Sequence, residues 1–232
     1  MPNARALILV AGLAAALPAA AEEARFDFSV SGIKIGTLEM GSDASGDRYT
    51  ASSKIETSGL VSVFANFFFD GTASGSLKGS HVVPSSYDAT SKSPRALRRT
   101  EIDWKGGTPV RVSVEPPRSS APDPATQAGT LDPVSAGFRL LRSVPTTELC
   151  NTTVDVFDGS RRSRLTVARP EISGTSATCE GTFARIEGEA NTMTVDRPFA
   201  FSLTFAIDGD SARLQRIDAP TSFGQAVISR RG

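Results

Sequence analysis

The sequence has few of the residues on which many enzymes and metal proteins depend. Its 232 residues include two cysteines, one histidine and one tryptophan. We predict neither a zinc site nor a dithiol redox centre, because zinc needs about four ligands and no C-x-x-C spacing occurs. The single histidine, His81, follows a turn glycine, which is typical of a solvated side chain rather than a general base. Nucleophile-elbow and phosphate-loop motifs, G-x-S-x-G and G-x-x-x-x-G-K-S/T, do not occur. We therefore predict a protein that is not an enzyme and holds no cofactor or metal ion.

An excess of one charge is also missing, because 25 basic residues balance 25 acidic ones. A near-neutral chain creates no overall field that would attract nucleic acid or an anionic membrane. We therefore predict no nucleic-acid partner.

The N-terminus carries an apolar run, residues 6–17, that is too short to span a bilayer comfortably. Arg5 precedes the run, and three alanines ending at Ala21 form an A-x-A cleavage motif. This pattern predicts a signal peptide over residues 1–21, cleaved after Ala21, and an uncleaved anchor is the alternative. The mature chain, residues 22–232, is expected to be exported as one soluble β domain, without a stable membrane span and as a monomer.

The two cysteines, Cys150 and Cys179, lie in the C-terminal half of the chain. In an exported chain two cysteines most simply pair with each other, so we predict a Cys150–Cys179 disulfide.

Turn sequences punctuate segments in which apolar and polar residues alternate. Examples are Lys78-Gly79-Ser80, Lys105-Gly106-Gly107 and Asp208-Gly209-Asp210. The clearest alternation runs from Phe199 to Ile207, where every second residue is large and apolar. This pattern predicts an all-β antiparallel meander that closes into a sandwich or a barrel. Residues 59–69 fit either a helical turn or a buried strand, and we favour a turn near 59–66 and a strand from about Phe67.

One short helix is expected near residues 132–142. Asp132 is a suitable N-cap residue and Pro133 a suitable first helical residue. Val134, Phe138 and Leu141 then form an apolar stripe on one side of the helix.

The segment between the cysteines contains a hairpin signal at Asp158-Gly159, followed by Arg161, Arg162 and Arg164. A two-residue turn would place Asp155 opposite Arg162 as a cross-strand ion pair and leave Arg161 and Arg164 unpaired. The three arginines are candidates for binding a carboxylate, a phosphate or an acidic lipid head group. The alternative is a structural ladder of charges beside the disulfide.

Thirteen phenylalanines contrast with one tryptophan and two tyrosines. A curled sheet with such apolar stripes could enclose a ligand cavity, because the mouths of β-barrels commonly hold apolar ligands. Phe64, Phe67, Phe201 and Phe205 are the candidate lining residues. The alternative is an ordinary filled core.

Several of these motifs occur in an order that resembles a known exported bacterial family. They are the strand with Gly32 to Gly36, the helix start at 131–135, the hairpin F-D-G-S-R-R at 157–162 and Cys179-Glu180-Gly181. The chain resembles domain of unknown function 3108, which has no established activity. The resemblance implies a periplasmic protein with an antiparallel sheet curled into an open barrel, similar in shape to lipoprotein carriers. We therefore expect a non-enzymatic envelope protein that binds a hydrophobic or amphipathic ligand, such as a lipid, in a concave sheet. A scaffold or assembly factor that binds another envelope protein through a sheet edge is the alternative.

Overall fold

A computed structural model of the chain describes residues 21–58, 67–94, 96–118, 120–188 and 198–232. Residues 1–20 of the predicted signal peptide and Phe64 therefore lie outside the described residues, as does the helical turn expected near 59–66. The first strand begins at Glu22, one residue after the predicted cleavage site. None of the helices in the described part of the chain is long and apolar enough to cross a membrane.

The fold is all-β, as predicted, with one α-helix. The N-terminal strands are β1 (Glu22–Val30), β2 (Ile33–Ser45), β3 (Arg48–Thr57), β4 (Phe68–Lys78), β5 (His81–Ser93), β6 (Ala96–Lys105) and β7 (Thr108–Glu115). A connection with η1 (Pro124–Thr126), α2 (Pro133–Leu141), β8 (Val144–Pro145) and η2 (Thr146–Glu148) follows. The C-terminal strands are β9 (Thr152–Phe157), β10 (Arg161–Ser173), β11 (Ser176–Gly188), β12 (Phe199–Asp208), β13 (Ser211–Thr221) and β14 (Gly224–Arg230).

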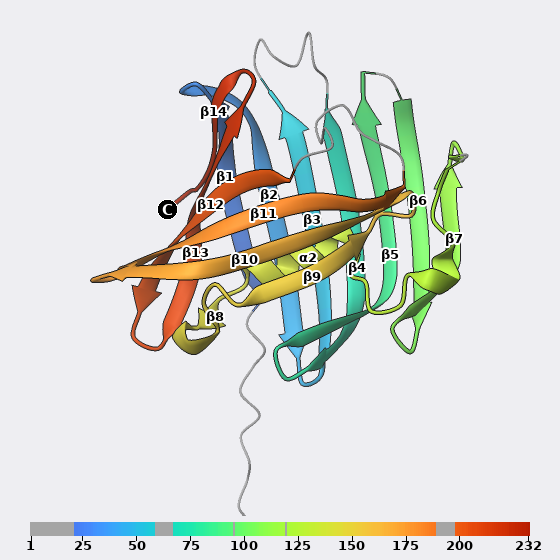
Figure 1. Ribbon diagram of the computed structural model, residues 1–232, viewed down its shortest axis with the longest axis horizontal. Coiled ribbons are helices and arrows are strands. Elements are labelled where there is room, and N and C mark those ends of the chain that lie inside the picture. The colour runs from blue at the N-terminus through green and yellow to red at the C-terminus, as the bar shows by residue number, and fades with distance from the viewer. Residues whose placement is uncertain (1–20, 59–66, 95, 119, 189–197) are drawn as a thin grey trace, which may run out of the picture.

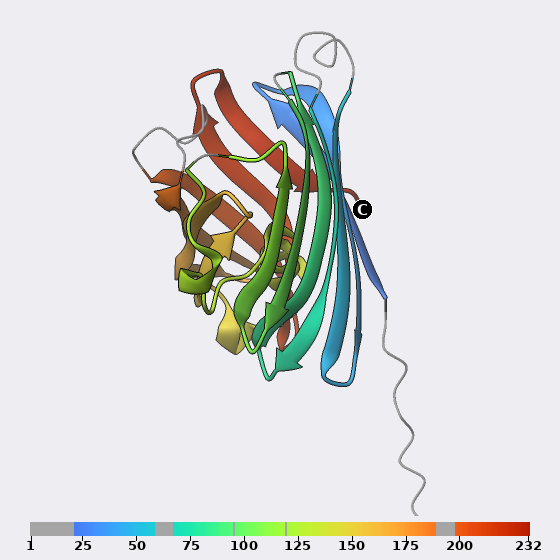
Figure 2. The same ribbon diagram turned by 90° about the vertical axis from the view of Figure 1, so that its right-hand side faces the viewer.

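All strands belong to one antiparallel sheet in which the first and last strands pair. The order is β7-β6-β5-β4-β3-β2-β1-β14-β13-β12-β11-β10-β9, and β8 pairs with β13. The sheet therefore consists of two meanders joined by the β1–β14 pairing. Figures 1 and 2 show that the second meander bends across the first, so the sheet curls into an open barrel that does not close. This confirms the expected fold class.

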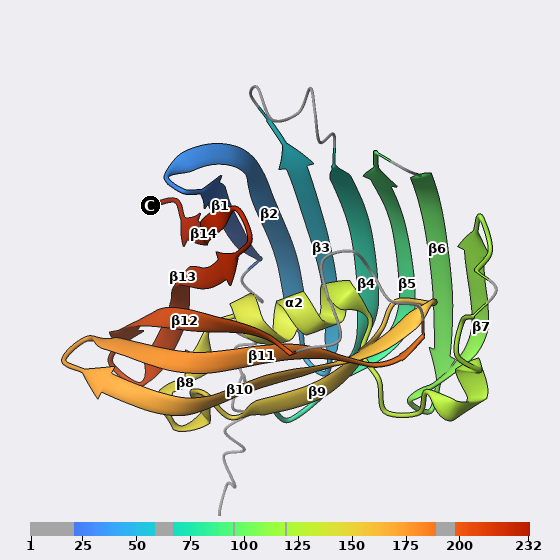
Figure 3. The ribbon, with the colours of Figure 1, turned by 45° about the horizontal axis from the view of Figure 1, so that its top comes forward.

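Helix α2 lies between the two arms of the sheet and fills much of the space that they enclose (Figure 3). Asp132 and Pro133 occupy the predicted N-cap and first helical positions. Phe138 stacks on Tyr49 of β3, with ring centroids 4.9 Å apart and planes 8° apart. Alanines on the inner face of the first arm, Ala51, Ala73 and Ala89, leave room for the helix because their side chains are short. The concave face is thus largely a packed core.

The charges along residues 99–115 predict a hairpin in which Asp103 lies opposite Arg111, Arg99 opposite Glu115 and Trp104 opposite Val110. The hairpin of β6 and β7 confirms most of this register. Asp103 pairs with Arg111 across the strands, and their side chains form an ion pair of 2.9 Å. The expected pairing of Trp104 with Val110 is wrong, because the register shifts after Asp103 and Trp104 lies opposite Pro109.

The predicted register of β9 and β10 is wrong by two residues. Asp155 lies directly opposite Arg164, and Phe157 lies opposite Arg162. The turn is wider than two residues because the Asp158 carboxylate accepts hydrogen bonds from the backbone N–H groups of Ser160 and Arg161, at 2.9 and 2.8 Å.

The N-cap of α2 is a buried carboxylate without a countercharge in hydrogen-bond contact among the described residues. Asp132 accepts hydrogen bonds from the backbone N–H and the hydroxyl of Ser135, and that hydroxyl is 2.6 Å from the Tyr49 hydroxyl. Burial raises the pKa of Asp132 from 3.8 to about 6, despite the opposing effect of these hydrogen bonds. The folded protein therefore resists ionisation of this residue more than the unfolded chain does.

This raised pKa predicts a stability loss between pH 4 and pH 6. The stabilisation is fully present below the unfolded pKa of 3.8 and is lost as the pH rises through about 6. The shift corresponds to about 3 kcal/mol. Asp132→Asn keeps a cap acceptor and cannot ionise, so the variant should not lose this stability. The difference in free energy of unfolding between the variant and the wild type should therefore shift in favour of the variant by about 3 kcal/mol from pH 4 to pH 7. Urea unfolding at several pH values measures it. Asp123→Asn, at the exposed cap of η1, is the control and should show no such trend.

Candidate functional site

A cleft opens beside α2, at the end of the barrel where β5 begins. Its volume is about 340 Å³. The lining residues come from β5, the connection before α2, α2 itself, β9 and β10: His81, Val82, Gly129, Leu131, Arg139, Thr153, Val154, Asp155 and Arg164. The wall combines apolar side chains with two arginines. Its size is near the lower end of the range for small-molecule sites.

Arg139 is the arginine that α2 brings to the cleft. Its side chain is 11% exposed, and its ion-pair partner is Glu148 of η2, with Nη2 and Oε2 3.7 Å apart. That separation exceeds hydrogen-bond length. The same Glu148 oxygen is buried and has no hydrogen-bond partner among the described residues. Arg139 is thus a half-buried cation with a loosely held counterion.

Arg164 and Arg162 both contact Asp155. Nε of Arg164 lies 2.7 Å from Oδ1 of Asp155, and Nη2 of Arg162 lies 2.6 Å from Oδ2. The hydrogen bond from Arg164 is the largest cause that holds the pKa of Asp155 below its ordinary value, and Arg162 adds to it, whereas burial opposes it. Two guanidinium groups therefore share the Asp155 carboxylate, and together with Arg139 the lining of the cleft holds two arginines and one acid.

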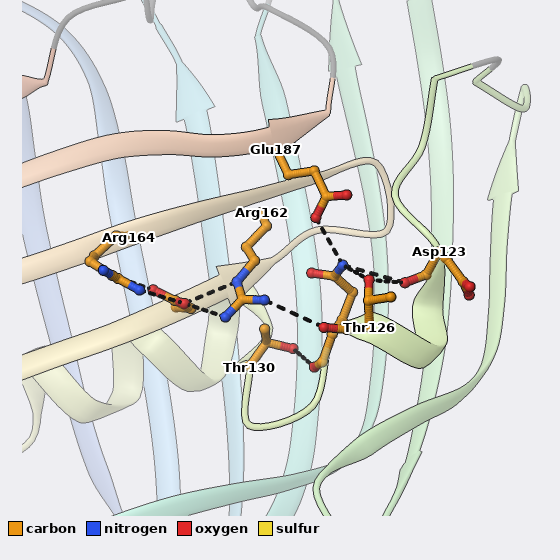
Figure 4. A network of polar contacts seen from close by, with 8 residues as sticks. Asp123, Thr126, Thr130, Arg162, Arg164 and Glu187 are labelled. Carbon is orange, nitrogen blue, oxygen red and sulfur yellow. Dashed lines mark hydrogen bonds and ion pairs between the residues drawn. The ribbon is translucent and has the colours of Figure 1, made fainter.

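Polar contacts fix the connection that forms one wall of the cleft (Figure 4). Gln127 is fully buried, and its side-chain amide donates to Glu187 of β11 at 3.1 Å. Arg162 donates to the backbone oxygen of Thr126 at 3.4 Å, and Thr130 donates to that of Gln127 at 2.8 Å. These contacts join the connection to β10 and β11, and so they position Gly129 and Leu131 beside Arg164.

The three arginines that were predicted to form one cluster differ in their ion-pair partners and in whether they line the cleft. The predicted ion pair between Asp155 and Arg162 is confirmed. The expectation that Arg161 and Arg164 are unpaired is wrong, because Arg161 contacts Asp158 at 2.9 Å and Arg164 contacts Asp155. Of the three, Arg164 alone lines the cleft.

The three predicted phenylalanines that the structure describes do not line this cleft. Phe205 is buried in the core, and Phe201 packs against the core with its ring over Gly181. Phe67 is 38% exposed and precedes β4 at the opposite end of the first arm. Sequence reasoning missed Arg139 as a cleft residue, because the residues that surround it in the cleft come from other elements of the fold. Whether any predicted residue binds a ligand stays a prediction.

The metal-ligating residue types do not gather in the described part of the chain: no three His, Cys, Asp or Glu side chains are placed there to hold an ion. The site as described offers charge and apolar surface. Its arrangement suits recognition of a molecule that has an acidic group and an apolar part.

Comparison with known proteins identifies a family and one similar structure. The family described as "Protein of unknown function (DUF3108)" matches residues 25–227. No curated protein matches the chain. The crystal structure of a β-barrel-like protein of domain of unknown function DUF1849 from Brucella abortus aligns with 93% of this chain and 97% of that one, with 11% identity and a TM-score of 0.45.

Proposed function

We propose a function for a chain that belongs to the DUF3108 family of proteins of unknown function: it is a non-enzymatic periplasmic protein that binds a small amphipathic molecule with an acidic group. The binding site is the cleft beside α2, and the protein acts as a monomer. The apolar part of the ligand contacts Val82, Leu131 and Val154, and the acidic group contacts Arg139.

The observation that carries this proposal is the loose pairing of Arg139. A half-buried guanidinium lacks a hydrogen-bonding carboxylate among the described residues, while it lines a cleft of about 340 Å³. Arginine binds carboxylates and phosphates through two parallel hydrogen bonds, and such charge-assisted bonds are roughly twice as strong as neutral ones. Glu148 lies 3.7 Å from Arg139, too far for a hydrogen bond. An acidic ligand would therefore supply the hydrogen-bonding anion that Arg139 lacks.

The disulfide between Cys150 and Cys179 supports the export component of the proposal, because disulfides persist in oxidising compartments such as the periplasm. The alternative function, a scaffold that pairs through a sheet edge, has less support. The edge strand β7 contains Pro109, and the backbone of Leu131 exchanges hydrogen bonds with Asp155 and Phe157 on the other edge strand, β9.

Binding of defined amphiphiles tests the proposal. Octanoate and octyl phosphate should bind in calorimetric titrations, whereas octanol at the same concentrations should not. Arg139→Gln should weaken octanoate binding roughly tenfold or more, because a charge-assisted pair contributes about 1.5–3 kcal/mol. Arg216→Gln is the matched control, since Arg216 pairs with Asp218 outside the cleft and should bind like the wild type.

Two results would contradict the proposal. One is octanol binding as tightly as octanoate. The other is an unchanged affinity in Arg139→Gln while the variant keeps its fold. Mass spectrometry of molecules that co-purify with the exported protein then identifies the natural ligand class.

A further inference from the structure

Four large apolar side chains are exposed at one end of the barrel, each at or near a turn between two neighbouring strands. Ile33 begins β2, Phe67 precedes β4, Leu97 lies near the start of β6, and Phe223 lies in the β13–β14 turn. Their exposed fractions are 67%, 38%, 63% and 84%. We call these four residues the apolar rim. In Figure 1 the strand ends that carry them lie along the upper edge of the molecule.

The four residues of the apolar rim occupy one continuous edge of the sheet. The Ser31 hydroxyl donates to the backbone oxygen of Phe223 at 3.0 Å, which joins the β1–β2 turn to the β13–β14 turn. Thr57 of β3 and Phe67 exchange hydrogen bonds at 3.0 to 3.1 Å. Lys92 of β5 lies opposite both Phe68 and Leu97. Neighbouring strands are about 4.8 Å apart, so the apolar rim follows adjacent strands without a break.

The turns at the other end of these strands have a different composition. They are Ser45–Arg48, Lys78–His81, Lys105–Thr108 and Asp208–Ser211, each with a glycine, and one large exposed apolar residue, Val110, lies within two residues of them. Ordinary hairpin turns in this protein are therefore polar. The apolar rim needs a separate explanation, because exposed apolar groups gathered in one place mark interaction sites.

The charges beside the apolar rim are mostly positive. Described residues 30–34, 56–58, 67–68, 92–94, 96–98 and 221–225 contain four charged side chains, the cations Lys34, Lys92 and Arg98 and the acid Glu56, which lies opposite Phe68 as Lys92 does. Lys34 contacts Asp27 at 2.8 Å, and Arg231 contacts the same carboxylate, so cations outnumber acids there as well. This local excess occurs in a chain whose total charge is zero.

We propose that the apolar rim is a docking surface for an anionic lipid bilayer. Separate apolar side chains that project from four strand ends suit a deformable surface, into which each can insert at the level of the head groups. Lysine and arginine residues beside them are attracted to anionic lipids. The apolar rim lies at the other end of β5 from His81 and the cleft, so this inference does not rest on the proposed ligand.

Vesicle flotation tests the proposal with the purified protein. Vesicles of phosphatidylethanolamine and phosphatidylglycerol at 3:1 should carry the protein upward, and phosphatidylcholine vesicles should carry much less. The triple variant Ile33→Ser, Leu97→Ser, Phe223→Ser should reduce binding roughly tenfold or more. The matched control is Val110→Ser, Ile172→Ser, Ile186→Ser, which removes exposed apolar residues elsewhere and should leave binding unchanged.

Two double lysine variants and a tryptophan fluorescence measurement extend the test. Lys34→Gln with Lys92→Gln should weaken binding to the anionic vesicles several-fold. Lys78→Gln with Lys105→Gln, in the opposite turns, should not. In Phe223→Trp the tryptophan emission should shift to shorter wavelength on addition of the anionic vesicles, and Val110→Trp should show no shift.

The proposal is overturned if the wild type binds neither vesicle, or if the rim triple and its control bind equally. It is also overturned if the apolar rim mediates self-association, which sedimentation would show as a dimer that the rim triple abolishes. Because Phe223→Trp changes one exposed residue, its spectrum decides the question even if the triple variant folds poorly.

Discussion

Replacement of Phe138 by alanine is expected to lower the free energy of unfolding by about 3–5 kcal/mol, the usual cost of removing a buried phenylalanine. Phe138 is 3% exposed, stacks on Tyr49, and lies under the guanidinium of Arg142, 5.8 Å from the ring centroid. Its removal would leave a void between α2 and the first arm of the sheet. Surrounding strands cannot close the void easily, because their positions are fixed by the sheet.

Denaturant unfolding measures this loss, and a second phenylalanine serves as the control. Phe223→Ala makes the same chemical change at a side chain that is 84% exposed, so its stability should change by less than about 0.5 kcal/mol. Similar losses in the two variants would contradict the assignment of α2 to the core. Phe138→Ala should also weaken octanoate binding, because the same helix carries Arg139.

Removal of the disulfide has the second largest expected effect. Cys150 and Cys179 are 29 residues apart, and their bond closes a loop that contains β9 and β10. In the chain-entropy account such a loop removes unfolded-state freedom worth about 3.5 kcal/mol. The double variant Cys150→Ala, Cys179→Ala should therefore lose about that much free energy of unfolding, measured by urea unfolding without reductant.

The reducing agent provides the control for this prediction. Wild-type protein in dithiothreitol should unfold near the midpoint of the double variant, whereas the double variant itself should not respond to dithiothreitol. A wild-type midpoint that is the same with and without the reductant would contradict a stabilising bond. Because the bond joins the connection before β9 to β11, its loss should also weaken binding in the cleft.

The sequence predicted one ion pair near the candidate site correctly, but it misplaced Arg164 and missed Arg139. The sequence indicated that Asp155 pairs with Arg162, since the two lie on either side of an obvious turn. It misplaced Arg164 because the Asp158 side chain widens the turn, and this shifts the strand register by two residues. It missed Arg139 as a cleft residue because the loose partner, Glu148, and the opposite wall, β9 and β10, come from other elements.

The sequence by itself determined the class of fold, the position of α2 and the disulfide. These features depend on alternation along a strand, on a cap and its next few residues, or on there being only two cysteines. The tertiary structure alone decided that α2 fills the concave face and that a charged cleft remains beside it. It also decided that four strand ends form one apolar rim. The physical reason is the pairing of β1 with β14, which joins the two meanders into one curled sheet and brings distant residues together.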